Sequence, residues 1–403
     1  MSNLEDRSKL PEWLQDTQNR SWEPEIIISG LTLTSLFILP TKLYEFCGML
    51  IQDYGVDYLS AILTLMYLSF AINLFKIFFI VHLMMRLAWT GMVGLSYAFP
   101  KGVINERLFK VFSHHKFKKP AELVMQLERL CSTLFAFPVY VGIILILFTF
   151  FLLLLVSIST YFEASIIYTM ALLVLSAFIY SGAALIFKNS SFARWIATSI
   201  PSTISSVYQS NLGKWPVQIS VFVFMIASGP FIIEDTRGFS KFYNFSGIDT
   251  QWISKSELYF DLQESEKRFS RAFINTATFK NQDVIELNIA YYAEDERIVR
   301  EYQQATGSNI GLDSLNWQDV NEFEDLIKVY VNDSLIQIEK WQYLSLPQTN
   351  QKVLSTYIDI SRLPVGQNNI RIEKLTFADL EPIISRWIIR KKWAEIPFYK
   401  TAN

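Results

Sequence analysis

The sequence predicts a membrane α-helical bundle with about five transmembrane helices, followed by a mainly β, sandwich-like soluble domain. Two observations predict this fold class. Before residue 235, several apolar windows reach the length that a membrane-spanning helix needs. After residue 235, apolar and polar residues alternate in short segments, which is typical of half-buried strands.

The apolar windows are judged by length, because a helix needs about 20 mostly apolar residues to cross a hydrocarbon core about 30 Å thick. The expected spans are residues 26–47, 58–81, 131–158, 164–187 and 215–233. The third is the clearest, with an uncharged run from Gly142 to Val156. We expect Pro40 to kink the first span, and the fifth, which contains Gln218, is barely long enough.

The second span has two interpretations, because apolar sequence continues past Lys76 as far as Phe99. A hairpin would need a turn near Lys76, but no Gly or Pro lies between Tyr58 and Thr90 to form one. We therefore expect one long helix from Tyr58 to about Tyr97 that leaves the bilayer. The hairpin would instead place the C-terminal domain in the cytoplasm.

The distribution of Lys and Arg predicts the orientation, because cytoplasmic loops are enriched in them. Residues 100–130 hold seven and residues 188–214 hold three, whereas residues 51–57 and 159–163 hold none. With five crossings, residues 1–25 and loops 82–130 and 188–214 are cytoplasmic, and residues 235–403 are extracytoplasmic. The N-terminus lacks a cleavable signal-peptide pattern. We expect a multi-pass protein of the inner (plasma) membrane, with a periplasmic domain if the cell is Gram-negative.

The C-terminal region predicts strands at residues 283–292, 326–331, 334–339 and 353–360, where apolar and polar residues alternate. Asn332 and Asp333 between two of these segments predict a tight hairpin. Residues 363–373 predict a turn that leads into another strand. A helix is expected from the acidic residues at 294–296 to Gln304. An apolar stripe with helical spacing comprises Leu380, Ile383, Ile384, Trp387 and Ile388.

Charge argues against nucleic acid as a partner. Residues 1–233 contain 16 Lys and Arg against 13 Asp and Glu. Subtraction from the totals of 36 and 38 leaves 20 and 25 for residues 234–403, a formal charge of −5. Neither part has the basic excess of a nucleic-acid-binding protein. The expected partners are the lipid bilayer and other membrane or envelope proteins, and a homo-oligomer is compatible with the sequence.

Recognisable catalytic and cofactor motifs are absent from the sequence. It contains no phosphate-binding loop, no HExxH, no GxSxG, no GxGxxG and no calcium-binding EF-hand loop. The two cysteines, Cys47 and Cys131, lie in or beside apolar segments and form no CxxC pattern. We therefore assign no catalytic residue, no cofactor and no metal from the sequence.

Charged residues within apolar segments are candidates for an intramembrane polar site, because burying a charge at the bilayer centre is costly. His82 and Arg86 are four residues apart on one helix face, and Lys76 lies about a quarter turn away. Alternatively, the helix has already left the hydrocarbon near Lys76 and these side chains reach the membrane surface. Glu45 is a further candidate, although its spacing from Lys42 also predicts a simple ion pair.

The expected cytoplasmic loop interleaves basic and aromatic residues, a pattern that predicts contact with anionic lipid headgroups. The basic residues are Arg107, Lys110, Lys116, Lys118 and Lys119. His114 and His115 in this loop lack a third ligand at suitable spacing, so no metal site is assigned. In the C-terminal region, Glu294, Asp295 and Glu296 are expected to form a solvated helix start, which the helix dipole favours.

The leading functional hypothesis is a non-enzymatic anchor, scaffold or envelope-complex subunit that binds partners through its C-terminal domain, because that domain is strand-rich and free of catalytic motifs. The first alternative is a transporter or channel subunit with this domain as a lid or receptor. The second is a membrane enzyme that acts on lipid or an envelope polymer, using the region from His82 to His115. Five spans do not divide into the two matching halves of many transporters.

Overall fold

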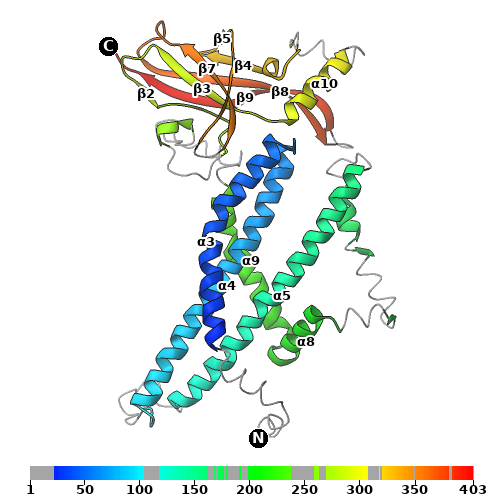
Figure 1. Ribbon diagram of the computed structural model, residues 1–403, viewed down its shortest axis with the longest axis vertical. Coiled ribbons are helices and arrows are strands. Elements are labelled where there is room, and N and C mark those ends of the chain that lie inside the picture. The colour runs from blue at the N-terminus through cyan, green and yellow to red at the C-terminus, as the bar shows by residue number, and fades with distance from the viewer. Residues whose placement is uncertain are drawn as a thin grey trace. The chain divides into compact units, whose positions relative to one another are not determined.

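The computed structural model of this 403-residue chain describes residues 22–103, 118–161, 168, 171–176, 178–179, 190–191, 198–236, 258–262, 269–306, 317, 320–347, 350–380 and 384–402. Figure 1 shows the elements in chain order, from α3 in blue to β9 in red. The chain divides into two compact units. The helical unit comprises residues 1–39, 70–157 and 175–229, and the strand-rich unit comprises residues 40–69, 158–174 and 230–403.

Three of the described helices are long and apolar enough to cross a membrane. They are α3 (Trp22–Gln52), α4 (Tyr58–Ala98) and the part of α5 (Pro120–Tyr161) that ends at Leu155. They correspond to the first three expected spans. Helix α9 (Lys214–Thr236) covers the fifth expected window, and most of the fourth, residues 164–187, lies outside the described residues.

Helix α4 is a single helix of 41 residues. It passes through Lys76 without a turn, so the hairpin interpretation of this segment is wrong. This continuity is explained by the sequence from Tyr58 to Thr90, because it contains no Gly or Pro that would interrupt the hydrogen bonds of the helix. Helix α5 in turn begins at Pro120, so much of the expected loop at residues 82–130 is helical.

An aromatic cluster holds the helical unit together. Phe78 of α4 stacks on Phe137 of α5 with ring centroids 4.6 Å apart, and on Phe224 of α9 with centroids 4.3 Å apart. Tyr208 of α8 (Ile200–Leu212) packs edge-on against Phe137 and donates a hydrogen bond to the Thr133 carbonyl. Such ring pairs add about 0.5–1.5 kcal/mol each beyond the burial of area.

The described residues of the strand-rich unit form two sheets. The four-stranded sheet has the order β1 (Ala272–Ile274), β3 (Val284–Ala290), β7 (Lys352–Asp359) and β6 (Gln342–Ser345). The five-stranded sheet has the order β2 (Thr278–Phe279), β9 (Ile384–Lys400), β8 (Gly366–Leu380), β4 (Ile327–Val331) and β5 (Ser334–Ile336). Neighbouring strands are antiparallel except β2 and β9, which are parallel.

Both sheets contribute to one hydrophobic core. Ile285, Leu287 and Ile289 of β3 alternate into it, as the period of two along the strand predicts, and Ile370 and Ile372 of β8 belong to the same cluster. The predicted hairpin at residues 332–333 is confirmed. Both of its loop residues have positive φ, 47° and 65°, as a two-residue type I′ loop requires.

The helical spacing of the apolar stripe from Leu380 to Ile388 does not correspond to a helix, because residues from Ile384 onward form β9 and pair with β8. Trp387 and Ile389 pack with Phe377 against the cluster that contains Ile298 of α10 (Glu294–Thr306). This burial, together with the β-branched isoleucines, favours the strand. Helix α10 itself begins and ends close to the predicted positions.

The strand-rich unit includes the ends of two long helices. Cys47 and Ile51 of α3, with Ala61 and Leu65 of α4, are members of the same buried core cluster as the strands. Hydrogen bonds reinforce this packing: the Ala293 amide donates to the Ile51 carbonyl at 3.3 Å, and the Lys352 amide donates to Gln52 Oε1 at 2.8 Å. The tip of the helical hairpin, residues 40–69, therefore packs into the core of the strand-rich unit.

Aromatic rings and cations extend this contact. The Arg271 guanidinium lies 4.8 Å from the ring centre of Tyr58, the first residue of α4, and 5.9 Å from that of Trp393 on β9. The Tyr58 ring also meets the Tyr292 ring edge-on, with centroids 6.4 Å apart. Cation–π contacts of this kind contribute about 0.5–2 kcal/mol each, depending on how dry they are. They connect the beginning of α4 to the strands that follow.

Candidate functional site

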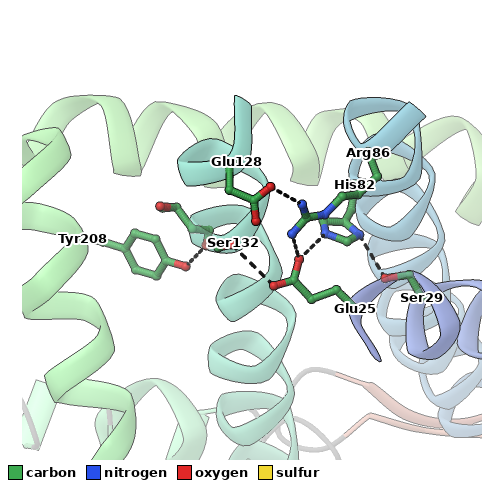
Figure 2. Close-up of polar contacts among 8 residues, drawn as sticks. Glu25, Ser29, His82, Arg86, Glu128, Ser132 and Tyr208 are labelled. Atoms are coloured by element: carbon green, nitrogen blue, oxygen red, sulfur yellow. Dashed lines mark hydrogen bonds and ion pairs between the residues drawn. The ribbon is translucent and has the colours of Figure 1, made fainter. Parts of the chain in front are cut away.

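Charged side chains from α3, α4 and α5 meet inside the helical unit (Figure 2). We call this group the polar cluster: Glu25 from α3, His82 and Arg86 from α4, and Glu128 from α5. The four-residue spacing of His82 and Arg86 places both on the α4 face that α3 and α5 contact. All three helices are of membrane-spanning length and apolarity.

Arg86 bridges the two carboxylates of the polar cluster. Its Nη1 donates to Glu128 Oε2 at 3.0 Å, and its Nη2 donates to Glu25 Oε2. The side chain is only 1% exposed, against 8% for Glu25 and 34% for Glu128. The Trp89 ring centre lies 5.5 Å from the guanidinium carbon. One guanidinium thus links three helices, a role that its planar fork of donors suits.

His82 is buried beside the same carboxylate and is also 1% exposed. Its Nδ1 lies 3.0 Å from Ser29 Oγ of α3, and its Nε2 lies 3.6 Å from Glu25 Oε2. Among the described residues, Nε2 has no hydrogen-bond partner. The Phe135 ring of α5 covers the imidazole at a centroid distance of 5.2 Å. His82 and Arg86 therefore approach one oxygen of Glu25 together (Figure 2).

In the polar cluster, ion pairing between the carboxylates and Arg86 offsets the cost of removing these charges from water. Desolvating an ion costs several kcal/mol, which an ion pair offsets only if its hydrogen bonds are well made. Removing one partner leaves an uncompensated buried charge and costs about 3–5 kcal/mol. We therefore expect the loss of Glu25 to cost more than the loss of Glu128, whose side chain is 34% exposed.

The other proposed members of an intramembrane site lie elsewhere. The Lys76 ammonium is 5.4 Å from the ring centre of Phe37 on α3. Glu45 pairs with Lys42 at 2.8 Å, as their three-residue spacing predicts. His82 and Arg86 are both buried among the neighbouring helices. The alternative that α4 has left the hydrocarbon near Lys76 stays a prediction.

Sequence reasoning missed Glu25 and Glu128. Glu25 was assigned to the polar segment before the first span, and Glu128 to a loop. The available signal was the helix start: Glu25 immediately precedes the apolar run that begins at Ile26, and Glu128 lies close to the start of the third window. Each carboxylate is therefore at the end of an apolar stretch, where a neighbouring helix can supply a cation.

Of the five residues expected to contact anionic lipid, the structure describes two. Lys118 and Lys119 are exposed just before α5, and Lys118 Nζ donates to Gln126 Oε1 at 3.0 Å. Arg107, Lys110 and Lys116 lie outside the described residues, as do His114 and His115. Lipid contact at this loop stays a prediction.

The acidic start of α10 is only partly solvated, which corrects the expectation for Asp295. Its side chain is 5% exposed and pairs with Lys374 Nζ of β8 at 2.6 Å. The Lys374 ammonium in turn lies 4.3 Å from the Tyr292 ring centre and 5.1 Å from that of Trp393. Burial raises the pKa of the Asp295 carboxyl, although the Lys374 ammonium opposes this shift. Only a partner distant in sequence explains this burial.

Comparison of the chain with protein-family models, with curated proteins and with solved structures finds no match.

Proposed function

We propose that this protein is a non-enzymatic anchor, scaffold or envelope-complex subunit of the inner (plasma) membrane. In this proposal about five spans cross the bilayer, residues 1–25 are cytoplasmic, and residues 235–403 form an extracytoplasmic, sandwich-like domain that binds partner proteins. In a Gram-negative cell this domain is periplasmic. The three apolar helices of membrane-spanning length support the membrane assignment.

The observation that carries the proposal is the packing of helix ends into the core of the strand-rich unit. A domain joined to a membrane anchor by a linker would have its own closed core. Here Ile51 and Leu65, from two helices of membrane-spanning length, are 1% and 0% exposed within the strand core. The helix ends at residues 40–69 therefore belong to the same compact unit as the strands, which supports a role for this unit close to the membrane anchor.

Strand β6 supplies a candidate binding surface. It is the last strand of the four-stranded sheet, and all four of its residues are exposed, including Tyr343 and Leu344. An edge strand carries backbone donors and acceptors that a strand of another protein can pair with. The Tyr343 hydroxyl donates a hydrogen bond to Glu324, and the Tyr343 ring packs edge-on against Phe323. These two contacts fix the position of the Tyr343 side chain on β6.

The test is purification of the tagged full-length protein from its own membranes in a mild detergent, with mass spectrometry of the retained proteins and a size measurement. We expect at least one stoichiometric partner. Leu344→Lys on β6 should remove that partner, because Lys on an edge strand disfavours pairing. Leu335→Lys is the matched control: Leu335 is 55% exposed on β5, an edge of the other sheet. Absence of any stoichiometric partner would contradict the proposal.

The polar cluster favours a second candidate function, that of a transporter or channel subunit with the strand-rich domain as lid or receptor. Buried ionisable residues in membrane helices often line ion pathways. In this reading, a homo-oligomer supplies the remaining helices of a pore. Flux of protons or small ions into liposomes containing the purified protein, abolished by His82→Gln but not by Lys42→Gln, is the expected result. Equal flux with both variants argues against this function.

A further inference from the structure

We propose that the strand-rich unit carries a binding site for a phosphate group, formed by Arg271, which immediately precedes β1, and Arg390 of β9. We call these two side chains the arginine pair. The proposal goes beyond partner binding and does not depend on it. It rests on the register of the strands, on the aromatic rings beside the arginine pair and on the carboxylates within its reach.

The register of β8 and β9, which are neighbouring strands in Figure 1, brings two cations together. Lys374 of β8 is directly opposite Arg390 of β9 in this antiparallel pair. Like charges that face each other across two strands destabilise a sheet. Lys374 is only 4% exposed and Arg390 is half-buried, so water and salt screen this repulsion poorly. An anion bound at Arg390 would remove this cost.

A β-bulge after Arg390 places an aromatic ring beside these cations. Between the pairs Lys374–Arg390 and Ile372–Ala394, one residue of β8 faces three residues of β9. In a regular strand, residues 390 and 393 would point to opposite faces of the sheet. The bulge instead allows the Trp393 ring centre to lie 5.1 Å from the Lys374 ammonium. Bulges next to functional sites redirect side chains in this way.

Arg271 approaches the same ring from the other sheet. Its guanidinium carbon lies 5.9 Å from the ring centre of Trp393 and 4.8 Å from that of Tyr58. Burial lowers the pKa of the Arg390 guanidinium, and the nearby Arg271 guanidinium lowers it further, whereas Glu294 opposes the shift. The two members of the arginine pair therefore repel each other in a partly desolvated place.

The carboxylates at the start of α10 are already engaged with other cations. Asp295 pairs with Lys374 at 2.6 Å, and Glu294 pairs with Arg297 at 3.0 Å. Within the part of the chain that the structure describes, neither member of the arginine pair forms an ion pair with a carboxylate. Partly buried cations without a counter-charge are costly, so an anion that contacts both guanidinium groups would stabilise them.

Phosphate is the anion that this arrangement suits. A guanidinium group donates two parallel hydrogen bonds to phosphate oxygens, and one phosphate group has enough oxygens for two arginines. Tyr58 is the first residue of α4, a helix of membrane-spanning length and apolarity. Tyr and Trp side chains are enriched where such helices meet the headgroup layer. We therefore expect a phospholipid headgroup as the source of the phosphate, and free inorganic phosphate is the alternative source.

The test compares thermal midpoints of the full-length protein in a neutral detergent after addition of phosphatidylglycerol, inorganic phosphate or sodium chloride at equal ionic strength. A ligand that binds only the folded protein raises the midpoint. We expect phosphatidylglycerol to raise it by about 5–10 °C at about a hundred times the dissociation constant. An equal rise with inorganic phosphate would identify free phosphate as a sufficient ligand. An equal rise with sodium chloride would overturn the proposal, because it would reflect screening alone.

Arg390→Gln separates a binding role from a structural role. Without phosphate or phospholipid, this variant should be at least as stable as the wild type, because the repulsion with Lys374 is lost. Its affinity for phosphatidylglycerol, measured from the dependence of the midpoint on lipid concentration, should fall by about tenfold to a hundredfold. An arginine with only a structural role predicts the opposite: a lower midpoint without ligand and an unchanged affinity.

Two further variants complete the test. Arg386→Gln is the matched control, because it makes the same charge change at an exposed position of β9 and should leave the affinity unchanged. Arg271→Gln should lower the affinity as Arg390→Gln does, and it serves if Arg390→Gln does not fold. Absence of a shift in the wild type, or an equal loss of affinity in Arg386→Gln, would overturn the proposal. Partner retention is measured separately, so failure here leaves the proposed function standing.

Discussion

Truncation of Ile51 to alanine tests whether the strands depend on the helix ends. Ile51 is 1% exposed in the core cluster that includes strands of both sheets. The change removes about three methyl or methylene groups at about 0.8 kcal/mol each, and the residual cavity adds to this loss. We therefore expect a destabilisation of about 3 kcal/mol. At about 1.4 kcal/mol per factor of ten, protected amides of the strand-rich unit should exchange about a hundredfold faster.

The assay is hydrogen–deuterium exchange with mass spectrometry on the full chain in nanodiscs, with β3 and β7 as reporters. Met49→Ala is the control, because Met49 lies in the same turn region of α3 but is 38% exposed and outside the core cluster. Its effect should stay within about 0.5 kcal/mol, as for most surface changes. Faster exchange confined to the end of α3, with β3 and β7 unchanged, would refute the idea that the strand core depends on the helix ends.

Three further predictions concern buried charge and backbone conformation. Arg86→Met should lower the thermal midpoint in detergent by removing the partner of Glu25, a loss of about 3–5 kcal/mol, and Arg86→Lys should recover only part of it. Burial raises the folded-state pKa of Asp295, so its contribution to stability is greatest below the unfolded value of about 3.9 and declines as pH rises through the folded value. Lys374→Met removes the opposing ammonium and should steepen that decline between pH 4 and 8, measured by thermal unfolding; an unchanged slope would count against the pairing. Asp333→Gly should raise stability by a few tenths of a kcal/mol, because glycine adopts φ near 65° without strain, and a loss of stability would contradict this reasoning.

Local patterns predicted helices and strands correctly where the residues of a single segment determine its secondary structure. Apolar runs of membrane-spanning length gave α3, α4 and α5, and the continuity of α4 followed from the absence of helix breakers. Alternation predicted β3, β4 and β7, and Asn332 with Asp333 predicted the hairpin loop. The helical spacing of the stripe from Leu380 to Ile388 was misleading, because residues from Ile384 onward pair with β8, and Trp387 packs against the cluster that contains Ile298 of α10.

The sequence predicted fewer members of the polar cluster than it did helices and strands. His82 and Arg86 stood out because they are charged or polar within an apolar run, and their spacing placed them on one face. Their partners Glu25 and Glu128 are 61 and 42 residues from Arg86 along the chain, so no local pattern links them to it. Asp295 and Lys374, 79 residues apart, illustrate the same limit in the strand-rich unit.

The sequence by itself determined where the apolar helices lie, where strand periodicity begins and which residue types could carry charge inside the bundle, because these properties depend on neighbours within a turn or a strand. Only the tertiary structure decided that Arg86 joins two carboxylates, that Asp295 is buried and that the tip of α3 and α4 belongs to the strand core. Those outcomes depend on which surfaces meet when the chain folds. A buried charge or an apolar helix end is stable only once a distant segment supplies its partner.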